Sequence, residues 1–271
     1  MSIITISRGS YSKGKEIGIK VAEKLGYTAV SREIIIAASE EFNITEIKLA
    51  RAFHDAPSIF ERFTHGKERY IAHIASTLLA KFQEDNIVYH GLAGHFFAKG
   101  VSHVLKVRVI LDFEERIRTK MERDHVTRAI AAESLEKDDK ERRQWSLKLF
   151  GVDTWDASLY DLVVHICRLT VSDAVNIICD TVKLEQFKTT PESQKALDDL
   201  ALAANVKASI VDKYANSSVT AHEGIVIIGL RVSGSLGPRV VEEVKHLAEG
   251  VSGVKGVKVH LIPLTLFEHS P

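Results

Sequence analysis

Residues 3–18 read IITISRGSYSKGKEIG, and the organisation of the chain follows from them. Ile3, Ile4 and Ile6 form a short apolar run that is typical of a strand buried on both faces. Beyond a turn that contains glycine and serine, apolar residues recur at helical spacing, at Ile17, Val21, Ala22 and Leu25. The segment therefore predicts a buried strand, a glycine turn and a helix in direct succession.

A strand, a glycine turn and a helix form a geometry that binds phosphate, because backbone N–H groups and the helix N-terminus point toward the anion. Gly9, Gly14 and Lys15 have the spacing of the phosphate-loop signature, Gly-x4-Gly-Lys. The signature continues with a serine or threonine that contacts magnesium, whereas this chain has Glu16. An ordinary strand–helix turn is the alternative interpretation, since glycine and lysine are common residues.

Composition narrows the class of protein. The chain of 271 residues is long enough for one large domain or two unequal ones. Lys plus Arg and Asp plus Glu both number 36, so the formal net charge is zero. This balance argues against a dominant role in binding nucleic acid or a membrane surface.

The two cysteines, Cys167 and Cys179, lie in no CxxC or CxxH pattern, so neither a disulfide framework nor a metal site is predicted. The start of the chain lacks the basic and apolar regions of a signal peptide. No apolar run approaches membrane-spanning length. We therefore expect a cytoplasmic protein without a membrane span or a nucleic-acid partner.

Apolar periodicity predicts strands that alternate with helices over residues 1–184, which indicates an α/β domain with a parallel sheet covered by helices on both faces. Beyond the first strand and helix, the predicted strands are residues 27–30, 86–89, 104–111 and 162–166. The predicted helices are residues 32–42, 71–82, 113–121 and 171–182.

The pattern changes after residue 184. A polar stretch with Thr189, Thr190 and Pro191 predicts a linker over residues 185–192. Residues 193–271 then follow the order α-β-β-α-β, which predicts a small α+β domain.

A densely charged segment spans residues 118–143 and contains Arg123, Arg142 and Arg143. Guanidinium groups suit phosphoryl oxygens, and phosphoryl transfer often uses such charges on a lid that excludes water. We place this lid at about residues 124–150. The alternative is a solvated helix, because Asp139 lies one helical turn from the two adjacent arginines and an ion pair alone explains the spacing.

His90, Gly91, Gly94 and His95 follow the strand predicted at 86–89. The glycines would let a ligand approach the backbone, whereas two histidines without a third ligand are a weak metal signal and suit capping or packing. We expect Cys167 to be buried as a small apolar side chain, and Trp145 and Trp155 to anchor packing. No metal-ligating residue is predicted.

Several of these stretches, taken together, resemble a known family. ITISR at 4–8, GKEI at 14–17 and REII at 32–35 are similar to the N-terminal signature of the cytidylate-kinase-like nucleoside monophosphate kinases. DKERR at 139–143, FGVD at 150–153 and SLYDLV at 158–163 are similar to the lid of that family and the strand after it. The resemblance covers residues 3–182.

The resemblance implies a P-loop NTPase fold, with ATP and Mg²⁺ as cofactors and CMP or dCMP as the expected acceptor. On the matching positions, the implied catalytic residues are Lys15, Arg142 and Arg143. The implied nucleotide-contacting residues are Gly9, Ser12, Lys13, Gly14, Lys15, Glu16 and Arg123. The implied acceptor-binding residues are Arg32, Gly91 and Asp139.

Some positions depart from the usual pattern of the family. The turn has Tyr11 and Lys13 where family members carry more glycine, and Ser31 stands where an aspartate often precedes the REII run. His90 replaces an acidic residue, and Leu92 replaces the arginine that binds the acceptor phosphate. These departures leave two alternatives open: a nucleotide sensor without catalysis, or a kinase for another acceptor.

Residues 193–263 resemble a BON domain, through VTAHEGIVIIG at 219–229 and VSGVKGV at 251–257. A turn glycine between two strands and a Gly-Val pair before the last strand are the usual marks. The resemblance implies a regulatory module that binds a ligand or a partner. A packing domain or a homo-oligomer interface is the alternative.

Overall fold

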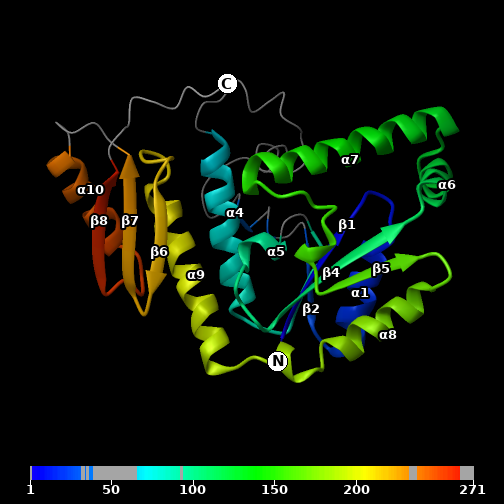
Figure 1. Ribbon diagram of the computed structural model, residues 1–271, viewed down its shortest axis with the longest axis horizontal. Helices are drawn as coiled ribbons and strands as arrows, with labels where there is room; N and C mark the ends of the chain where they lie inside the picture. Colours follow the sequence, from blue (N-terminus) through cyan, green and yellow to red (C-terminus); the bar gives the residue numbers. More distant parts are fainter. Residues whose placement is uncertain are drawn as a thin grey trace. The chain divides into compact units, whose positions relative to one another are not determined.

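The computed structural model describes residues 2–31, 34, 37–38, 66–91, 94–231 and 237–262 (Figure 1). Contacts divide the chain into two compact units, residues 1–62 with 84–194 and residues 63–83 with 195–271. No helix among the described residues is both long and apolar enough to cross a membrane.

The first unit is built on a parallel sheet of five strands, as the sequence predicts. Its order is β2 (Thr28–Val30), β3 (Ile87–Tyr89), β1 (Ile3–Arg8), β4 (Val104–Leu111) and β5 (Leu162–Ile166). The isoleucine-rich strand β1 lies in the middle, where Ile3 pairs with Ile87 on one side and with Val104 on the other. Burial on both faces and both edges explains why Ile3, Ile4 and Ile6 of this strand are apolar.

Two helices cover one face of this sheet. α1 (Gly14–Leu25) and α8 (Val171–Thr181) lie together in Figure 1. Ile17 and Val21 of α1 share a buried core with Ile178 of α8 and with alternate residues of β4, Leu105, Val107 and Val109. The intervening residues of β4, among them Arg108, therefore point to the opposite face of the sheet.

Between β3 and β5 the chain forms α5 (Gly94–Phe97), α6 (Phe113–Asp124) and α7 (Arg128–Phe150). The densely charged segment at 118–143 covers the end of α6 and most of α7. α7 is a long helix that begins after the N-cap Thr127 and ends at Gly151, which has a left-handed φ of 67°. Ile117 of α6 packs against Ala131 and Leu135 of α7, so the two helices form a small core of their own.

The predicted helix at 32–42 and the predicted linker at 185–192 compare differently with the structure. The helix predicted at 32–42 lies outside the described residues except for Ile34, Ala37 and Ala38. The stretch predicted as a linker, 185–192, contains the short 3-10 helix η3 (Glu185–Phe187) and the first residues of α9. Phe187 is buried in the core of the first unit, which holds this polar stretch against the unit.

The second unit contains α4 (Gly66–Phe82), α9 (Pro191–Ile210) from Lys195 onward, and a sheet of three strands. In that sheet β6 (Ser218–His222) is antiparallel to β7 (Ile225–Arg231), and β7 is parallel to β8 (Gly256–Ile262). α10 (Gly237–Glu249) contributes Val244 to the core beside Val226 and Ile228. The predicted order α-β-β-α-β is confirmed, whereas α4 groups with this unit although the sequence places it in the first domain.

We predict that Gly18→Ala destabilises the first unit. Alanine is more favourable than glycine inside a helix by about 1 kcal/mol. Here, however, its Cβ would lie 2.8 Å from Cβ of His90. Overpacking costs typically 1–3 kcal/mol, so we expect a net loss of about 1 kcal/mol in the free energy of unfolding. Urea unfolding followed by circular dichroism measures it.

Gly250→Ala is the matched control, because its Cβ would find its nearest heavy atom 3.5 Å away, at the carbonyl of Leu247. We expect its unfolding free energy to stay within about 0.5 kcal/mol of the wild type. A Gly18→Ala variant as stable as the wild type would mean that α1 and the end of β3 have room for a methyl group.

Candidate active site

The loop between β1 and α1 reverses the chain in a left-handed turn. Tyr11 and Lys13 adopt φ angles of 58° and 63°, a region that favours glycine. The hydroxyl of Ser12 donates to the carbonyl of Gly9 at 2.9 Å and closes the turn. α1 then begins at Gly14, where the first backbone N–H groups of a helix have no acceptor within the helix.

Gly14 is required at the start of α1 by a close approach. A Cβ at this position would lie 2.7 Å from both Cβ and Cδ of Arg8. The stem of Arg8 therefore packs directly on the backbone at the helix N-terminus. This contact holds the end of β1 and the start of α1 together on either side of the loop.

Arg116 of α6 ties the loop to α7. Its Nε donates to the carbonyl of Ser10 at 2.8 Å. Its Nη1 and Nη2 donate to the two carboxylate oxygens of Asp139 at 2.7 and 2.8 Å. Arg116 is only 8% exposed, so this forked ion pair is largely shielded from water. One side chain thus fixes the loop backbone and the middle of α7 at once.

Tyr11, at the tip of the loop, also contacts α6. Its hydroxyl donates to the carboxylate of Asp124. Lys120 Nζ and the guanidinium carbon of Arg123 lie 4.7 and 5.0 Å from the centre of its ring. Such cation–π contacts add to the ion pair of Arg116, so a loop with little glycine is held in one conformation.

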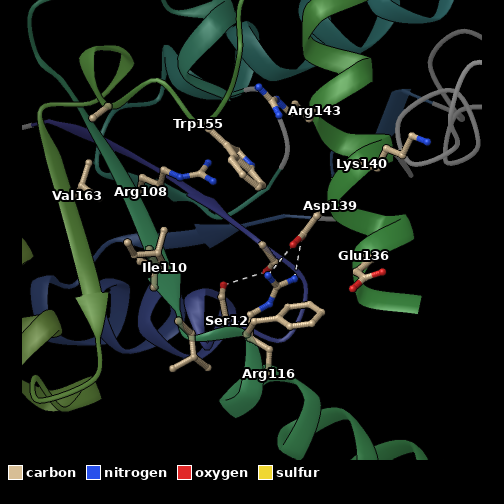
Figure 2. Close-up of a pocket in the computed structure, with 15 residues that line it drawn as sticks. Ser12, Arg108, Ile110, Arg116, Glu136, Asp139, Lys140, Arg143, Trp155 and Val163 are labelled. Atoms are coloured by element: carbon tan, nitrogen blue, oxygen red, sulfur yellow. Dashed lines mark hydrogen bonds and ion pairs between the residues drawn. The ribbon is translucent and has the colours of Figure 1, made fainter. Parts of the chain in front are cut away.

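A cavity of about 800 Å³ lies beside the loop. Figure 2 shows α7 along one side of it and strands β4 and β5 along the other. One part is apolar and another is positively charged. The lining residues are Gly9, Ser12, Arg108, Val109, Ile110, Leu111, Phe113, Arg116, Glu136, Asp139, Lys140, Arg143, Trp155, Ala157 and Val163.

Arg143 and Trp155 form one edge of this cavity (Figure 2). The guanidinium carbon of Arg143 lies 5.1 Å from the centre of the Trp155 ring, and its Nη2 lies 2.6 Å from Asp153. The backbone N–H of Trp155 and the guanidinium hold the pKa of Asp153 below its ordinary value. Asp153 therefore stays ionised and orients the arginine toward the ring.

A smaller recess of about 20 Å³ is lined by Ser7, Arg8, Gly9, Arg108, Asp139, Arg142, Thr154 and Trp155. Gly9, Arg108, Asp139 and Trp155 also line the larger cavity, so the two spaces adjoin. Arg142 Nη1 donates to the carbonyl of Arg8 at 3.1 Å. Burial, assisted by the charge of Arg142, lowers the pKa of Arg8 to about 10, and burial also lowers the pKa of Arg142.

The histidines after β3 are buried, as packing residues are. His90 is 4% exposed, and its Cβ lies against the backbone of Gly18. His95 packs its ring on Phe96 and Tyr160, with ring centres 3.9 and 5.0 Å away. Burial, with the charges of Arg108 and Lys106, lowers the pKa of His95 to about 4, so it is neutral at pH 7.

The structure brings several predicted site residues together. Gly9 and Ser12 of the loop and Asp139 and Arg143 of α7 line the cavity, and Arg142 lines the recess beside it. Asp139, predicted as an acceptor-binding residue, has both carboxylate oxygens on Arg116.

Other predicted residues lie away from the cavity. Lys13 and Lys15 are exposed, and Glu16 pairs with Lys20 at 2.7 Å on the outer surface of α1. The side chain of Arg123 is 73% exposed, and its guanidinium lies over the ring of Tyr11. Gly91 is needed for another reason than a ligand, because a Cβ there would lie 2.3 Å from the Tyr89 hydroxyl. Arg32 lies outside the described residues.

Two side-chain predictions are wrong. Cys167 is exposed, because it stands in the turn just after β5, where the sheet no longer covers it. Trp155, predicted as a packing anchor, is 58% exposed at the cavity. The side chain of Trp145 is outside the described residues.

Arg8, Arg108 and Arg116 are site residues that the sequence analysis did not single out. Arg8 directly precedes the glycine loop, and Arg108 interrupts an apolar strand with the period of two that marks one face. Both of these features can be read from the sequence alone. Arg116 lies in a helix with charges on most of its surface, and no local pattern distinguishes it from Arg118.

The donor groups of the cavity fit a nucleotide with its metal ion. A volume of about 800 Å³ is within the range of small-molecule sites, roughly 300–1,000 Å³. No group of three or more His, Cys, Asp or Glu side chains among the described residues is arranged to hold a metal. Mg²⁺ in kinases is held by one or two carboxylates and by substrate phosphates, and Glu136 is the carboxylate on this cavity not taken by Arg116.

The model of the Cytidylate kinase-like family matches residues 3–167, which span the loop, the cavity and strand β5. This chain belongs to that family. No curated protein matches the sequence.

The solved structures that resemble this chain include one that supports the fold and two with a weaker likeness. The crystal structure of an uncharacterized protein from Eubacterium ventriosum is 17% identical, with a TM-score of 0.52 over 68% of this chain and 99% of that chain. Shikimate kinase from Bacteroides thetaiotaomicron matches at 13% identity and a TM-score of 0.39, over 68% of this chain and 99% of that one. Dephospho-CoA kinase from Campylobacter jejuni matches at 16% identity and a TM-score of 0.35, over 67% of this chain and 97% of that one.

We predict that Arg116→Ala destabilises the first unit strongly. Removing one partner of a shielded ion pair leaves Asp139 and the Ser10 carbonyl without their donor, which costs roughly 3 kcal/mol. Urea unfolding followed by tryptophan fluorescence reports on this unit, because both tryptophans of the chain belong to it.

Arg118→Ala is the matched control, since Arg118 lies on the same helix and pairs with Glu115 in full contact with solvent. We expect a change below about 1 kcal/mol, as for exposed pairs in general. Equal effects of the two substitutions would show that the Arg116 fork does not hold the loop.

We predict that His95 makes the first unit sensitive to acid. Its pKa is 6.5 ordinarily and about 4 in the folded protein, so the unfolded chain binds the proton first as pH falls. Stability is therefore complete above pH 6.5 and is lost progressively toward pH 4, by at most about 1.4 kcal/mol per pH unit. Urea unfolding at pH 7 and pH 5 measures the loss.

His95→Phe keeps a ring against Phe96 and Tyr160 and has no proton to bind, so its loss of stability between pH 7 and 5 is expected to be smaller. His125→Asn is the control, because His125 is exposed with a left-handed φ that asparagine adopts readily. If the wild type and the His95→Phe variant lose the same unfolding free energy between pH 7 and pH 5, His95 is not the cause of the acid sensitivity.

Proposed function

We propose that this protein is a nucleotide kinase that transfers the terminal phosphoryl group of ATP to a nucleoside monophosphate, with CMP or dCMP as the acceptor. The observation that carries the proposal is the cavity beside the glycine loop, whose walls contain Arg108, Arg116, Lys140 and Arg143. Membership of the cytidylate kinase-like family supports the same chemistry. Transfer of a phosphoryl group requires positioning and neutralisation of charge more than covalent chemistry by the protein.

The residues divide this work between them. The backbone of Gly9 and the N-terminus of α1 offer N–H groups to the donor phosphates, and Lys15 in the first turn of α1 adds positive charge at the same helix end. Arg116 and Arg143 flank the cavity from the side of α6 and α7 and neutralise charge on the group in transfer. α7 itself covers one side of the cavity and limits the access of water (Figure 2).

Magnesium, when bound with ATP, would offset negative charge on the β- and γ-phosphates. In this chain Glu136 would face it from α7, and phosphate oxygens and water would complete its coordination. Arg32 and Gly91 would contact the acceptor, as the family resemblance implies. Asp139 contributes indirectly, by orienting Arg116.

A nucleotide sensor without catalysis is the second candidate, and His90 favours it. The acidic residue expected at this position would face the nucleotide, whereas His90 is buried against Gly18. In either case we propose that residues 1–184 form the nucleotide-binding domain in the cytoplasm. Residues 193–271 would then form a BON-like module that binds a regulatory ligand or mediates a homo-oligomer.

A coupled assay of ADP release with CMP, dCMP, UMP and AMP tests the kinase proposal. We expect turnover with CMP or dCMP, and a loss of roughly 100-fold or more in kcat/KM for Lys15→Ala, by analogy with the removal of one group that stabilises transition-state charge. Lys24→Ala on the same helix is the control, because Lys24 is exposed and contacts Asn176.

Three outcomes separate the candidates. Turnover that exceeds the Lys15→Ala variant supports the kinase. Wild-type turnover that equals both the Lys15→Ala variant and a blank without enzyme for every acceptor, together with nucleotide binding in a calorimeter, supports the sensor. A wild-type protein that neither binds nor converts any of these nucleotides contradicts both.

A further inference from the structure

Three arginines meet at the recess behind the main cavity. Arg8 comes from the end of β1, Arg108 from β4 and Arg142 from α7, and all three line a space of about 20 Å³. They are far apart in the sequence, so only the fold brings them together. Figure 2 shows the guanidinium of Arg108 beside the ring of Trp155, at the border between recess and cavity.

The hydrogen-bond acceptors of Arg108 and Arg142 are neutral groups. Arg142 donates to the carbonyl of Arg8 at 3.1 Å, and Arg108 donates to the hydroxyl of Tyr160 at 3.3 Å. Nε of Arg8 is buried and has no acceptor among the described residues. The part of the chain that the structure describes contains no ion pair of Arg8, Arg108 or Arg142 with a carboxylate.

Asp139 is the acidic residue that lines the recess, and both of its oxygens are bound by Arg116. Burial lowers the pKa of Arg142, and Asp139 together with Asp138 acts to raise it, so the two carboxylates offset part of the positive charge. Buried like charges are costly where the counter-charge is incomplete. In addition to burial, Arg142 lowers the pKa of Arg8, and Arg108 lowers the pKa of Arg142. Proteins retain such an arrangement where a bound anion supplies the missing charge.

We propose that Arg8, Arg108 and Arg142 form a binding site for the phosphate of a phosphate monoester, which is the acceptor phosphate of the reaction. This inference rests on the proposed function for the acceptor's role, and on the geometry alone for the binding of phosphate. Forked guanidinium donors match the oxygens of a dianion.

The shape of the recess agrees with a monoester. A volume of about 20 Å³ holds a group the size of a water molecule, and therefore one or two phosphate oxygens. The remainder of the ligand would extend past Arg108 and Trp155 into the larger cavity, because both residues line the two spaces. The sequence has Leu92 where the family carries an arginine for the acceptor phosphate. Arg8 and Arg108 would supply the charge that Leu92 lacks.

Calorimetric titration of the full chain with CMP, cytidine and inorganic phosphate tests the site. Arg8→Met and Arg108→Met remove the charge and keep an apolar stem, which matters for Arg8 because its Cβ and Cδ pack on Gly14. We expect each to weaken CMP binding roughly 10- to 150-fold, the effect of one hydrogen bond to a charged group. Cytidine, which has no phosphate, is expected to bind all variants equally.

Thermal unfolding without any ligand gives a second readout. Removal of one charge from a repelling cluster is expected to leave Tm unchanged or raise it, whereas the stabilisation that saturating inorganic phosphate or CMP gives the wild type is expected to shrink in both variants. Arg118→Met is the matched control, since Arg118 is exposed and already paired with Glu115, and it is expected to match the wild type in both measurements.

Each other outcome overturns the inference. CMP affinity within threefold of the wild type in both variants would mean that the arginines do not bind the phosphate. An equal loss of cytidine and CMP affinity would indicate structural damage in place of a phosphate contact. A wild type that binds neither CMP nor inorganic phosphate excludes the site altogether.

The same proteins distinguish this inference from the proposed function. Wild-type protein that binds CMP through Arg8 and Arg108 but releases no ADP would defeat the kinase and leave the phosphate site. Wild-type protein that turns over CMP, with an unchanged KM for CMP in both methionine variants, would defeat the phosphate site and leave the kinase.

Discussion

The fork between Arg116 and Asp139 is the contact on which the site depends. Arg116 comes from the helix after β4 and Asp139 from the middle of α7, and the same guanidinium reaches the carbonyl of Ser10 in the loop. A loop with only one glycine between β1 and α1 needs such support, because Tyr11 and Lys13 adopt left-handed angles at a cost. The shielded ion pair and the contacts of Tyr11 with α6 offset that cost and set the width of the cavity.

The zero net charge of the chain conceals a strong local imbalance. Arg8, Arg108 and Arg142 converge at one end of the sheet, and Asp139, the aspartate that lines their recess, is already paired with Arg116. Carboxylates that balance the total lie on exposed surfaces, such as Glu16 on α1. A field of this kind attracts anions to one place without making the protein generally basic. It explains how a neutral protein can present a site suited to nucleotides.

The alternation of apolar runs predicted the strands and helices well, because burial on a parallel sheet imposes an apolar period that any sequence of this fold must carry. The limits of β4 and β5 agree with the predicted ones to the residue. The structure of polar stretches was harder to predict. Residues 185–192 look like a linker in sequence, yet Phe187 inserts into the core, and one apolar side chain among polar ones has no period to detect.

The sequence by itself determined the parallel sheet of the first unit, the order α-β-β-α-β of the second and the glycine loop, since each depends on local spacing of residue types. Only the tertiary structure decided which charges meet. Lys15, the expected catalytic residue, is exposed in the first turn of α1 and lines neither cavity, while Arg8, Arg108 and Arg116 line the cavities. The physical reason is that a charged side chain looks the same in sequence whether it is solvated or buried. Its partner, which decides between the two, lies on another element.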